Sequence, residues 1–257
     1  MIKLTPLFSG SRGNSTLIRT SNQNILLDLG YGFKATLAKL NKLGVSPQNV
    51  AAIFVTHEHS DHIGALPSWI KHFHTQVFAP KNCCDYIAQN CYCSDIFPVD
   101  GALELDDVFV DIFRCSHDAR GCLGYRFSDG KNTVASVTDT GEPTPLLTEF
   151  LSPCQTIVLE SNHDVDMLKN GCYPYVLKRR ILSDLGHLSN EQAASVLQSL
   201  AQSSNLKTVV LGHLSQQNNT KQKAFDCAAS ALSQKGVSVG KDINVYVADQ
   251  YENEVTV

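Results

Sequence analysis

The chain has 257 residues, of which 43% are hydrophobic and 18% are charged, and its formal net charge is −4. This composition is typical of a globular protein with enough apolar material for a sizeable core, and the charge gives no global sign of a nucleic-acid binder. No apolar stretch approaches the roughly 20 residues of a membrane helix, so a membrane-spanning protein is excluded. The N-terminus lacks the apolar core of a signal peptide, and nine cysteines are expected as reduced thiols, which together predict a cytoplasmic protein.

Short apolar runs alternate with helix-like segments along the whole sequence, which predicts one α/β domain over residues 1–257. The first strands are expected at residues 3–7, 16–18 and 24–28, with a turn at 9–14. Helices are expected at residues 34–43, 64–73, 83–89, 191–201 and 221–234.

Five strand-like runs each end near a histidine or a carboxylate. The runs are residues 51–55, 108–113, 133–137, 156–159 and 208–211, and the residues that follow them are His57, His117, Asp139, Glu160 and His213. Sites in open α/β sheets form at the carboxyl ends of the strands, in the crevice that the loops build there. We therefore expect these five side chains to converge on one site.

Residues 57–62 have the pattern His-x-His-x-Asp-His. In extended backbone, alternate side chains share a face, so His57 and His59 can hold one metal ion together. Asp61 and His62 lie where the chain turns into a predicted helix, and they can address a second ion beside the first. Imidazole and carboxylate ligands suit Zn, Mn or Fe, and no cysteine in the motif calls for a softer site. A polar loop with chance histidines is disfavoured, because four of the six residues are ligand types.

The motif, with His117, Asp139 and His213 following in that order, resembles the metallo-β-lactamase superfamily. Within it the chain resembles the YycJ/WalJ-like group, whose members are regarded as DNA exonucleases, over residues 9–15, 138–141, 160–164, 186–190 and 212–215. The resemblance implies an αββα sandwich, in which two mixed β-sheets are flanked by helices.

The resemblance also implies a two-metal site. One divalent ion would be held by His57, His59 and His117, the other by Asp61, His62 and His213, and Asp139 would bridge them. Zinc is the expected metal, with Mn or Fe as alternatives. From the residues alone, His117 is equally a lone surface histidine, and Asp139 is equally a turn residue in Thr-Asp-Thr-Gly.

The sequence Gly-His-Leu-Ser occurs twice, around His187 and around His213. His213 directly follows a strand run and is the better ligand, whereas His187 precedes residues 189–192, which fit a capping box that opens a helix. By resemblance to ribonuclease Z, His187 pairs with Glu160 and protonates the leaving oxygen. The alternative is that both residues only anchor loops by hydrogen bonds.

Weaker signals concern substrate contacts. Asn14 lies in a Gly- and Ser-rich turn that either cradles a phosphate or is the first hairpin turn. His163 either faces the substrate, orients a ligand or is a satisfied loop histidine. The basic run at residues 178–180 either contacts a nucleic-acid backbone or is a solvated face.

The cysteines at positions 83–93 are crowded, but their spacing does not match a common zinc module. We expect free thiols, in and after a helix, rather than an extra metal or redox site; the residues are Cys83, Cys84, Cys91 and Cys93.

The predicted activity is metal-dependent hydrolysis of a phosphodiester, with metal-activated hydroxide, oriented by Asp61, attacking phosphorus. The resemblance implies a nuclease, expected to be a 5′→3′ exonuclease on double-stranded DNA, so the expected partner is nucleic acid and not a membrane. A thioester hydrolase resembling glyoxalase II, or a lactam hydrolase, would share the same ligands and is the main alternative. Redox chemistry of the flavodiiron type is disfavoured, since those proteins usually have Glu where this chain has His59. A non-catalytic module is disfavoured because every expected ligand is present.

Overall fold

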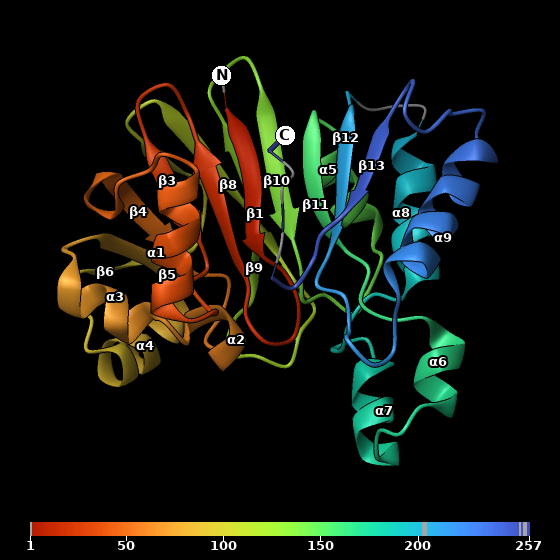
Figure 1. Cartoon of the computed structure of the whole chain (residues 1–257), viewed down its shortest axis with the longest axis horizontal. Coiled ribbons are helices and arrows are strands. Elements are labelled where there is room, and N and C mark those ends of the chain that lie inside the picture. The colour runs from red at the N-terminus through yellow and green to blue at the C-terminus, as the bar shows by residue number, and fades with distance from the viewer. Residues whose placement is uncertain (1, 202–204, 252, 254–255) are drawn as a thin grey trace.

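The computed structural model describes residues 2–201, 205–251, 253 and 256–257. Two β-sheets pack face to face in the middle, and helices cover both outer faces (Figure 1). This is the predicted αββα sandwich, so the expected fold is confirmed. The described part of the chain has no helix long and apolar enough to cross a membrane.

The first sheet is mixed and has the order β1-β2-β3-β4-β5-β6. β1 to β3 are antiparallel, whereas β3 to β6 are parallel. Its strands are Lys3–Phe8, Ser15–Arg19, Asn24–Leu27, Val50–Phe54, Gln76–Pro80 and Ile96–Val99. The helices on its outer side are α1 Phe33–Lys42, α2 Ser60–Ile63, α3 Leu66–His72 and α4 Cys84–Cys91, with short 3-10 turns at Pro47–Asn49 and Lys81–Cys83.

The second sheet is also mixed, with the order β13-β12-β11-β10-β9-β8-β7. β7 to β10 are antiparallel, whereas β10 to β13 are parallel. Its strands, from β7 to β13, are Leu103–Leu105, Val108–Arg114, Leu123–Ser128, Thr133–Val137, Thr156–Glu160, Thr208–Gly212 and Asn244–Val247. The helices of this half are α5 Pro145–Leu151, α6 Val165–Asn170, α7 Tyr175–Ile181, α8 Asn190–Leu200 and α9 Lys221–Ser233.

Strand alternation builds the layers, because successive side chains of a strand point to opposite faces. In β4, Phe54 belongs to the cluster between the sheets and Ile53 to the cluster beneath α1, α3 and α4. In β11, Val158 faces the other sheet, whereas Ile157 packs with the cluster that includes α5, α8 and α9. Both sheets are therefore apolar on both faces, and polar side chains gather at the strand ends.

One predicted helix differs from the structure. The helix expected at residues 64–73 starts earlier and is broken into α2 and α3. Gly64 lies at the break, where a Cβ atom would come within 2.6 Å of the Ser60 carbonyl oxygen and 2.8 Å of that of Gly30. The chain turns against this backbone, and Pro67 in the first turn of α3 begins the new helix.

Candidate metal centre

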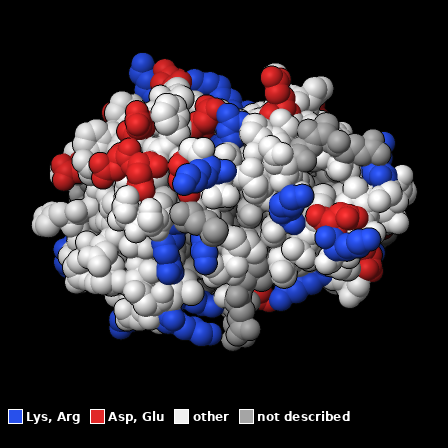
Figure 2. Space-filling view, turned by 90° about the horizontal axis from the view of Figure 1, so that it is seen from above, with Lys and Arg blue, Asp and Glu red and all other residues white. Residues whose placement is uncertain are grey.

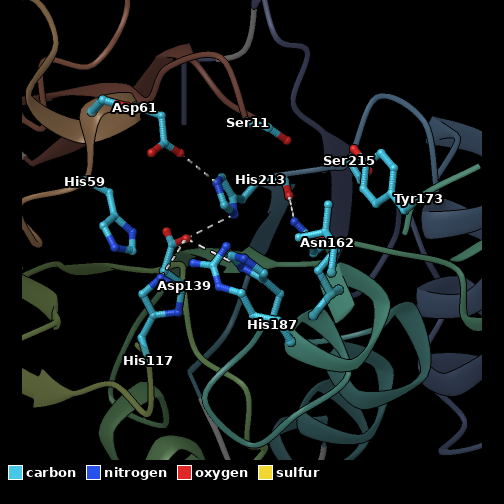
Figure 3. A pocket seen from close by; sticks show the side chains of 14 residues that line it. Ser11, His59, Asp61, His117, Asp139, Asn162, Tyr173, His187, His213 and Ser215 are labelled. Atoms are coloured by element: carbon cyan, nitrogen blue, oxygen red, sulfur yellow. Dashed lines mark hydrogen bonds and ion pairs between the residues drawn. The ribbon is translucent and has the colours of Figure 1, made fainter. Parts of the chain in front are cut away.

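The carboxyl ends of β4, β10, β11 and β12 meet at the lower edge of the sandwich in Figure 1, where β4 leads into α2 and β11 into α6. His57 follows β4, Asp139 follows β10, Glu160 ends β11 and His213 follows β12. Around them lies a cavity of about 340 Å³, shown in Figure 3. Figure 2 shows the opposite edge of the molecule, where basic and acidic side chains are interspersed.

Ligand-type side chains form four overlapping groups at this cavity, and in each group one ligand atom per residue lies within 4.8 Å of the others. Two of the groups match the predicted ligand sets, namely His57, His59 and His117, and Asp61, His62 and His213. The other two contain Asp139 and overlap with the first two; they are His57, His62 and Asp139, and Asp139, Glu160, His187 and His213. The structure therefore brings together the six residues that the sequence divided between two metal ions.

Four of these histidines have one ring nitrogen tied to the protein. Nδ1 of His57 lies 3.0 Å from Thr56 Oγ1, and Nδ1 of His62 lies 2.8 Å from Asp28 Oδ2. Nδ1 of His117 lies 3.1 Å from the Gly186 carbonyl oxygen, and Nδ1 of His213 lies 2.9 Å from Glu160 Oε1. The Nε2 atoms of His57, His117 and His213 are buried and have no hydrogen-bond partner among the described residues. Metal-binding histidines use this arrangement, in which a partner fixes the ring and leaves the other nitrogen for the ion. The residues present therefore fit metal ions.

Asp139 lies between the two groups. Its carboxylate oxygens are 3.3 Å from His62 Nε2 and 3.9 Å from His117 Nε2, and the side chain is 2% exposed. Burial would raise the pKa of Asp139, but attraction to His213 and His62 outweighs it and holds the pKa well below its ordinary value. The position suits the bridging role that the resemblance assigns to this residue.

The backbone is strained at three site residues. Asp28, Asp139 and His213 have φ angles of 60°, 59° and 56°, in the left-handed region that residues with a Cβ atom rarely adopt. Such conformations persist only where the surrounding structure enforces them, and they are concentrated at functional sites.

Glu160 joins two histidines beneath the cavity. It is fully buried, and its Oε1 accepts hydrogen bonds from Nδ1 of His187 at 2.8 Å and from Nδ1 of His213 at 2.9 Å. Burial would raise the pKa of Glu160, but His187 outweighs it and lowers the pKa to about 2. The predicted pairing of Glu160 with His187 is present, while its bond to His213 was not anticipated from the sequence.

Asp28 was not identified from the sequence as a residue of the site. Its Oδ2 lies 2.8 Å from Nδ1 of His62, and its Oδ1 accepts a hydrogen bond from the Thr56 amide at 2.8 Å. Burial raises the pKa of Asp28, although His62 opposes that shift. A usable signal was present, because Asp28 ends the predicted strand 24–28 in the same way that other site residues follow their strands.

Asn14 and His163 lie behind the cavity and do not line it. The Asn14 side chain accepts a hydrogen bond from the Gly10 amide at 2.9 Å, and its Nδ2 lies 3.1 Å from His62 Nε2. His163 is 1% exposed, its backbone pairs with Ser189, and both of its ring nitrogens are buried without a hydrogen-bond partner among the described residues. A substrate contact stays a prediction for both residues, and the structure places neither where it would touch a ligand in the cavity.

The basic run at residues 178–180 reaches the cavity at one residue. Arg180 lines the cavity and is paired with Asp118. The Lys178 ammonium donates to the carbonyl oxygens of Lys169 and Gly171 instead. Ser11, Asn162 and Ser215 also line the cavity and lie in stretches that carry the resemblance, whereas Tyr173 and Leu177 line it without any signal in the sequence.

The crowded cysteines are free thiols, as predicted. Cys83 donates to Glu58 Oε2 at 3.1 Å, and Cys84 points at backbone carbonyl oxygens. Burial raises the pKa of Cys83 strongly and that of Cys91 to about 11, which makes both poor nucleophiles. Among the described residues, these cysteines belong to no metal-ligand group.

The capping box predicted at residues 189–192 is confirmed. The Ser189 side chain accepts from the Gln192 amide, and the Gln192 side chain accepts from the Ser189 amide. This cap starts α8 directly after His187, so the helix holds the loop that carries this histidine.

Comparisons with known proteins agree with the fold. A family model described as "Beta-lactamase superfamily domain" matches residues 23–214. The chain is 35% identical over 248 residues to "Exodeoxyribonuclease YycJ" of Bacillus anthracis, which covers 95% of this chain and 94% of that protein. It is 33% identical over 252 residues to "Exodeoxyribonuclease WalJ" of Streptococcus pneumoniae (strain D39), which covers 95% and 93%.

Among solved structures, the metallo-beta-lactamase fold protein YhfI from Bacillus subtilis matches with a TM-score of 0.75 and 15% identity, over 100% of this chain and 98% of that chain. This likeness shows the fold alone. The chain belongs to the beta-lactamase superfamily. Within that superfamily it is a YycJ/WalJ-like protein.

Proposed function

We propose that this protein is a metal-dependent DNA exonuclease. The two relatives described above are named exodeoxyribonucleases and align with nearly the whole chain. The observation that carries the proposal is the His187–Glu160 pair, which lies at the cavity beside the ligand groups and fits protonation of a departing sugar oxygen. Double-stranded DNA as the substrate and 5′→3′ polarity are part of the proposal.

The ligand sets in the proposal are His57, His59 and His117 for one divalent ion, and Asp61, His62 and His213 for a second, with Asp139 shared. When bound, two divalent ions supply an activated water at neutral pH and neutralise charge on the phosphate oxygens. The donor set contains nitrogen and oxygen atoms only, which suits zinc, manganese or iron.

Asp61 is proposed to orient the attacking water. Its carboxylate is 24% exposed, faces the cavity and lies 3.4 Å from His62 Nε2 and 3.6 Å from His213 Nε2. Burial would raise the pKa of Asp61, but His62 and His213 outweigh it and hold the pKa far below its ordinary value. The side chain therefore stays a carboxylate and can accept a hydrogen bond from water at any pH near neutrality.

His187 is proposed as the general acid. Its Nδ1 is held by Glu160, which leaves Nε2 for the substrate, and its side chain is 16% exposed at the cavity wall. A buried carboxylate behind an imidazole stabilises the protonated ring and fixes its orientation, as general acid catalysis requires. The proton goes from Nε2 to the departing sugar oxygen.

The test is degradation of linear duplex DNA labelled at one 5′ end or uniformly, with added Mn²⁺ or Zn²⁺. The control is a variant that combines Asp61→Ala with His62→Ala. Degradation from the ends by the unmodified protein alone supports the proposal, and the two labels report the polarity. If neither protein degrades DNA or RNA although the unmodified protein holds metal, the proposal fails, and thioesters and lactams become the substrates to test.

A further inference from the structure

The cavity has one apolar wall, which the proposed chemistry does not use. It comes from the excursion between β11 and α8 that carries α6 and α7, and Figure 1 shows these helices hanging below the sandwich beside the site. Tyr173, Leu177 and Ile181 from this excursion line the cavity. Leu177 and Ile181 are four residues apart in α7, so they share one helix face, and Tyr173 precedes them by a further four residues.

The opposite side of the cavity is made of charged and metal-ligating groups. Figure 3 shows the Tyr173 ring beside Ser215 on one side and Asp61 and His59 on the other. A bound molecule that fills this space fits best with an anionic group toward the metal-binding residues and a flat apolar surface toward Tyr173. A nucleotide has both, because its phosphate and its base lie on opposite sides of the sugar.

The wall is held in place by the rest of the excursion. The Lys178 ammonium donates to the carbonyl oxygens of Lys169 and Gly171 at 2.8 and 2.7 Å, which ties α7 to the end of α6. The Arg180 guanidinium donates to Asp118 at 2.8 Å, which ties α7 to the loop after His117. A stacking surface fixed before the ligand arrives loses little entropy on binding.

The outer side of the same excursion provides a matched control. Tyr175 is 73% exposed and does not line the cavity, although it lies only two residues from Tyr173. The guanidinium carbon of Arg179 lies 6.0 Å from the centroid of its ring. Two tyrosines of one excursion therefore differ in whether they face the cavity.

We propose that Tyr173, supported by Leu177, is the surface on which the terminal nucleobase of the DNA strand stacks while its phosphate lies at the metal centre. This inference rests on the proposed nuclease function and adds the contact that places the end of the strand. Aromatic stacking accepts every base, because each base has a π face. The wall therefore predicts end binding without sequence preference.

The first test measures stacking without turnover. The metal-loaded protein is mixed with oligonucleotides that carry the fluorescent base 2-aminopurine at the 5′ end or at the 3′ end and phosphorothioate linkages near both ends. We expect fluorescence quenching with 2-aminopurine at the 5′ end for the unmodified protein, for Tyr173→Phe and for Tyr175→Ala, and loss of quenching for Tyr173→Ala. Quenching with 2-aminopurine at the 3′ end instead would support Tyr173 as the stacking surface and contradict the proposed 5′→3′ polarity. No quenching at either end, or equal quenching by Tyr173→Ala, overturns the inference.

The second test is kinetic and compares a normal 5′ end with one whose terminal base is missing. For the unmodified protein, loss of the base should raise KM about tenfold, equivalent to about 1.4 kcal/mol of stacking. For Tyr173→Ala the two substrates should have the same KM. Equal base dependence in both proteins overturns the inference even if DNA is degraded. Quenching without any DNA degradation leaves the stacking surface standing and overturns the nuclease function.

Discussion

Glu160→Gln perturbs the network that ties His187 and His213 together. Oε1 of Glu160 accepts hydrogen bonds from Nδ1 of both histidines at 2.8 and 2.9 Å, and Oε2 accepts from the amides of Thr140 and Leu188 at 3.0 and 3.2 Å. The single oxygen of a Gln amide can accept either from the two histidines or from the two backbone amides, so two of the four donors lose their acceptor. Hydrogen bonds to a charged group contribute about 1.5–3 kcal/mol each, so the free energy of unfolding should fall by about 3–6 kcal/mol.

The substitution should also change the two imidazoles. If the Gln oxygen serves the backbone amides, its NH2 group faces the histidines, which must then carry their protons on Nε2. A protonated Nε2 of His213 cannot bind a metal ion, and loss of such a supporting partner typically lowers metal affinity about 10–100-fold. His187 loses the carboxylate that accepts from its Nδ1 and fixes the orientation of the ring, so kcat on DNA should fall at least ~10²-fold.

The assay combines thermal unfolding, metal content and turnover. We expect the midpoint of unfolding to fall by on the order of 10 °C. Turnover is compared on duplex DNA and on thymidine 5′-p-nitrophenyl phosphate, whose leaving group needs no protonation. A deficit that is large on DNA and small on the p-nitrophenyl ester traces to His187, whereas equal deficits trace to His213 and the metal. An unchanged unfolding midpoint together with unchanged DNA turnover would refute the reasoning.

Three further predictions follow from single contacts. Asp28→Asn should weaken metal binding about 10–100-fold, because Asp28 Oδ2 orients Nδ1 of His62 at 2.8 Å, and competition with a chromophoric chelator measures this loss. His187→Ala should lower kcat on DNA about 10²–10⁴-fold but spare the p-nitrophenyl ester, and full activity on DNA would remove the general acid from the mechanism. Asp164 caps α6 and binds Lys223; burial would raise its pKa, but these partners outweigh it and hold the pKa below 3.8. The cap therefore stabilises the fold above about pH 4 and loses its effect as the pH falls through the lowered pKa. Asp164→Ala should cost about 1 kcal/mol at neutral pH and progressively less as the pH falls below about 4, as urea unfolding over this pH range would show.

Local sequence patterns were enough to predict an α/β fold and the ligand-type residues of the site, and the family resemblance added the αββα sandwich. Residues 57–62 place four such residues within six positions, and this local pattern needs no tertiary information to be seen. The strand runs that precede His117, Asp139 and His213 are likewise local, because apolar periodicity reflects the burial of each strand. The capping box at Ser189 was readable for the same reason, since its two hydrogen bonds span only three residues.

The contacts that support and shape the site join residues far apart in the sequence, so they became visible only in the folded chain. Glu160 meets His213 across 53 residues, and Asp28 meets His62 across 34, because neighbouring strands of a sheet bring these positions together. Sequence separation contains no information on which strands are neighbours, so neither the second partner of Glu160 nor the histidine that Asp28 supports could be derived, although the position of Asp28 at a strand end was a usable signal. The same holds for Tyr173, which reaches the cavity only because the excursion carrying α6 and α7 folds back beneath the strand ends.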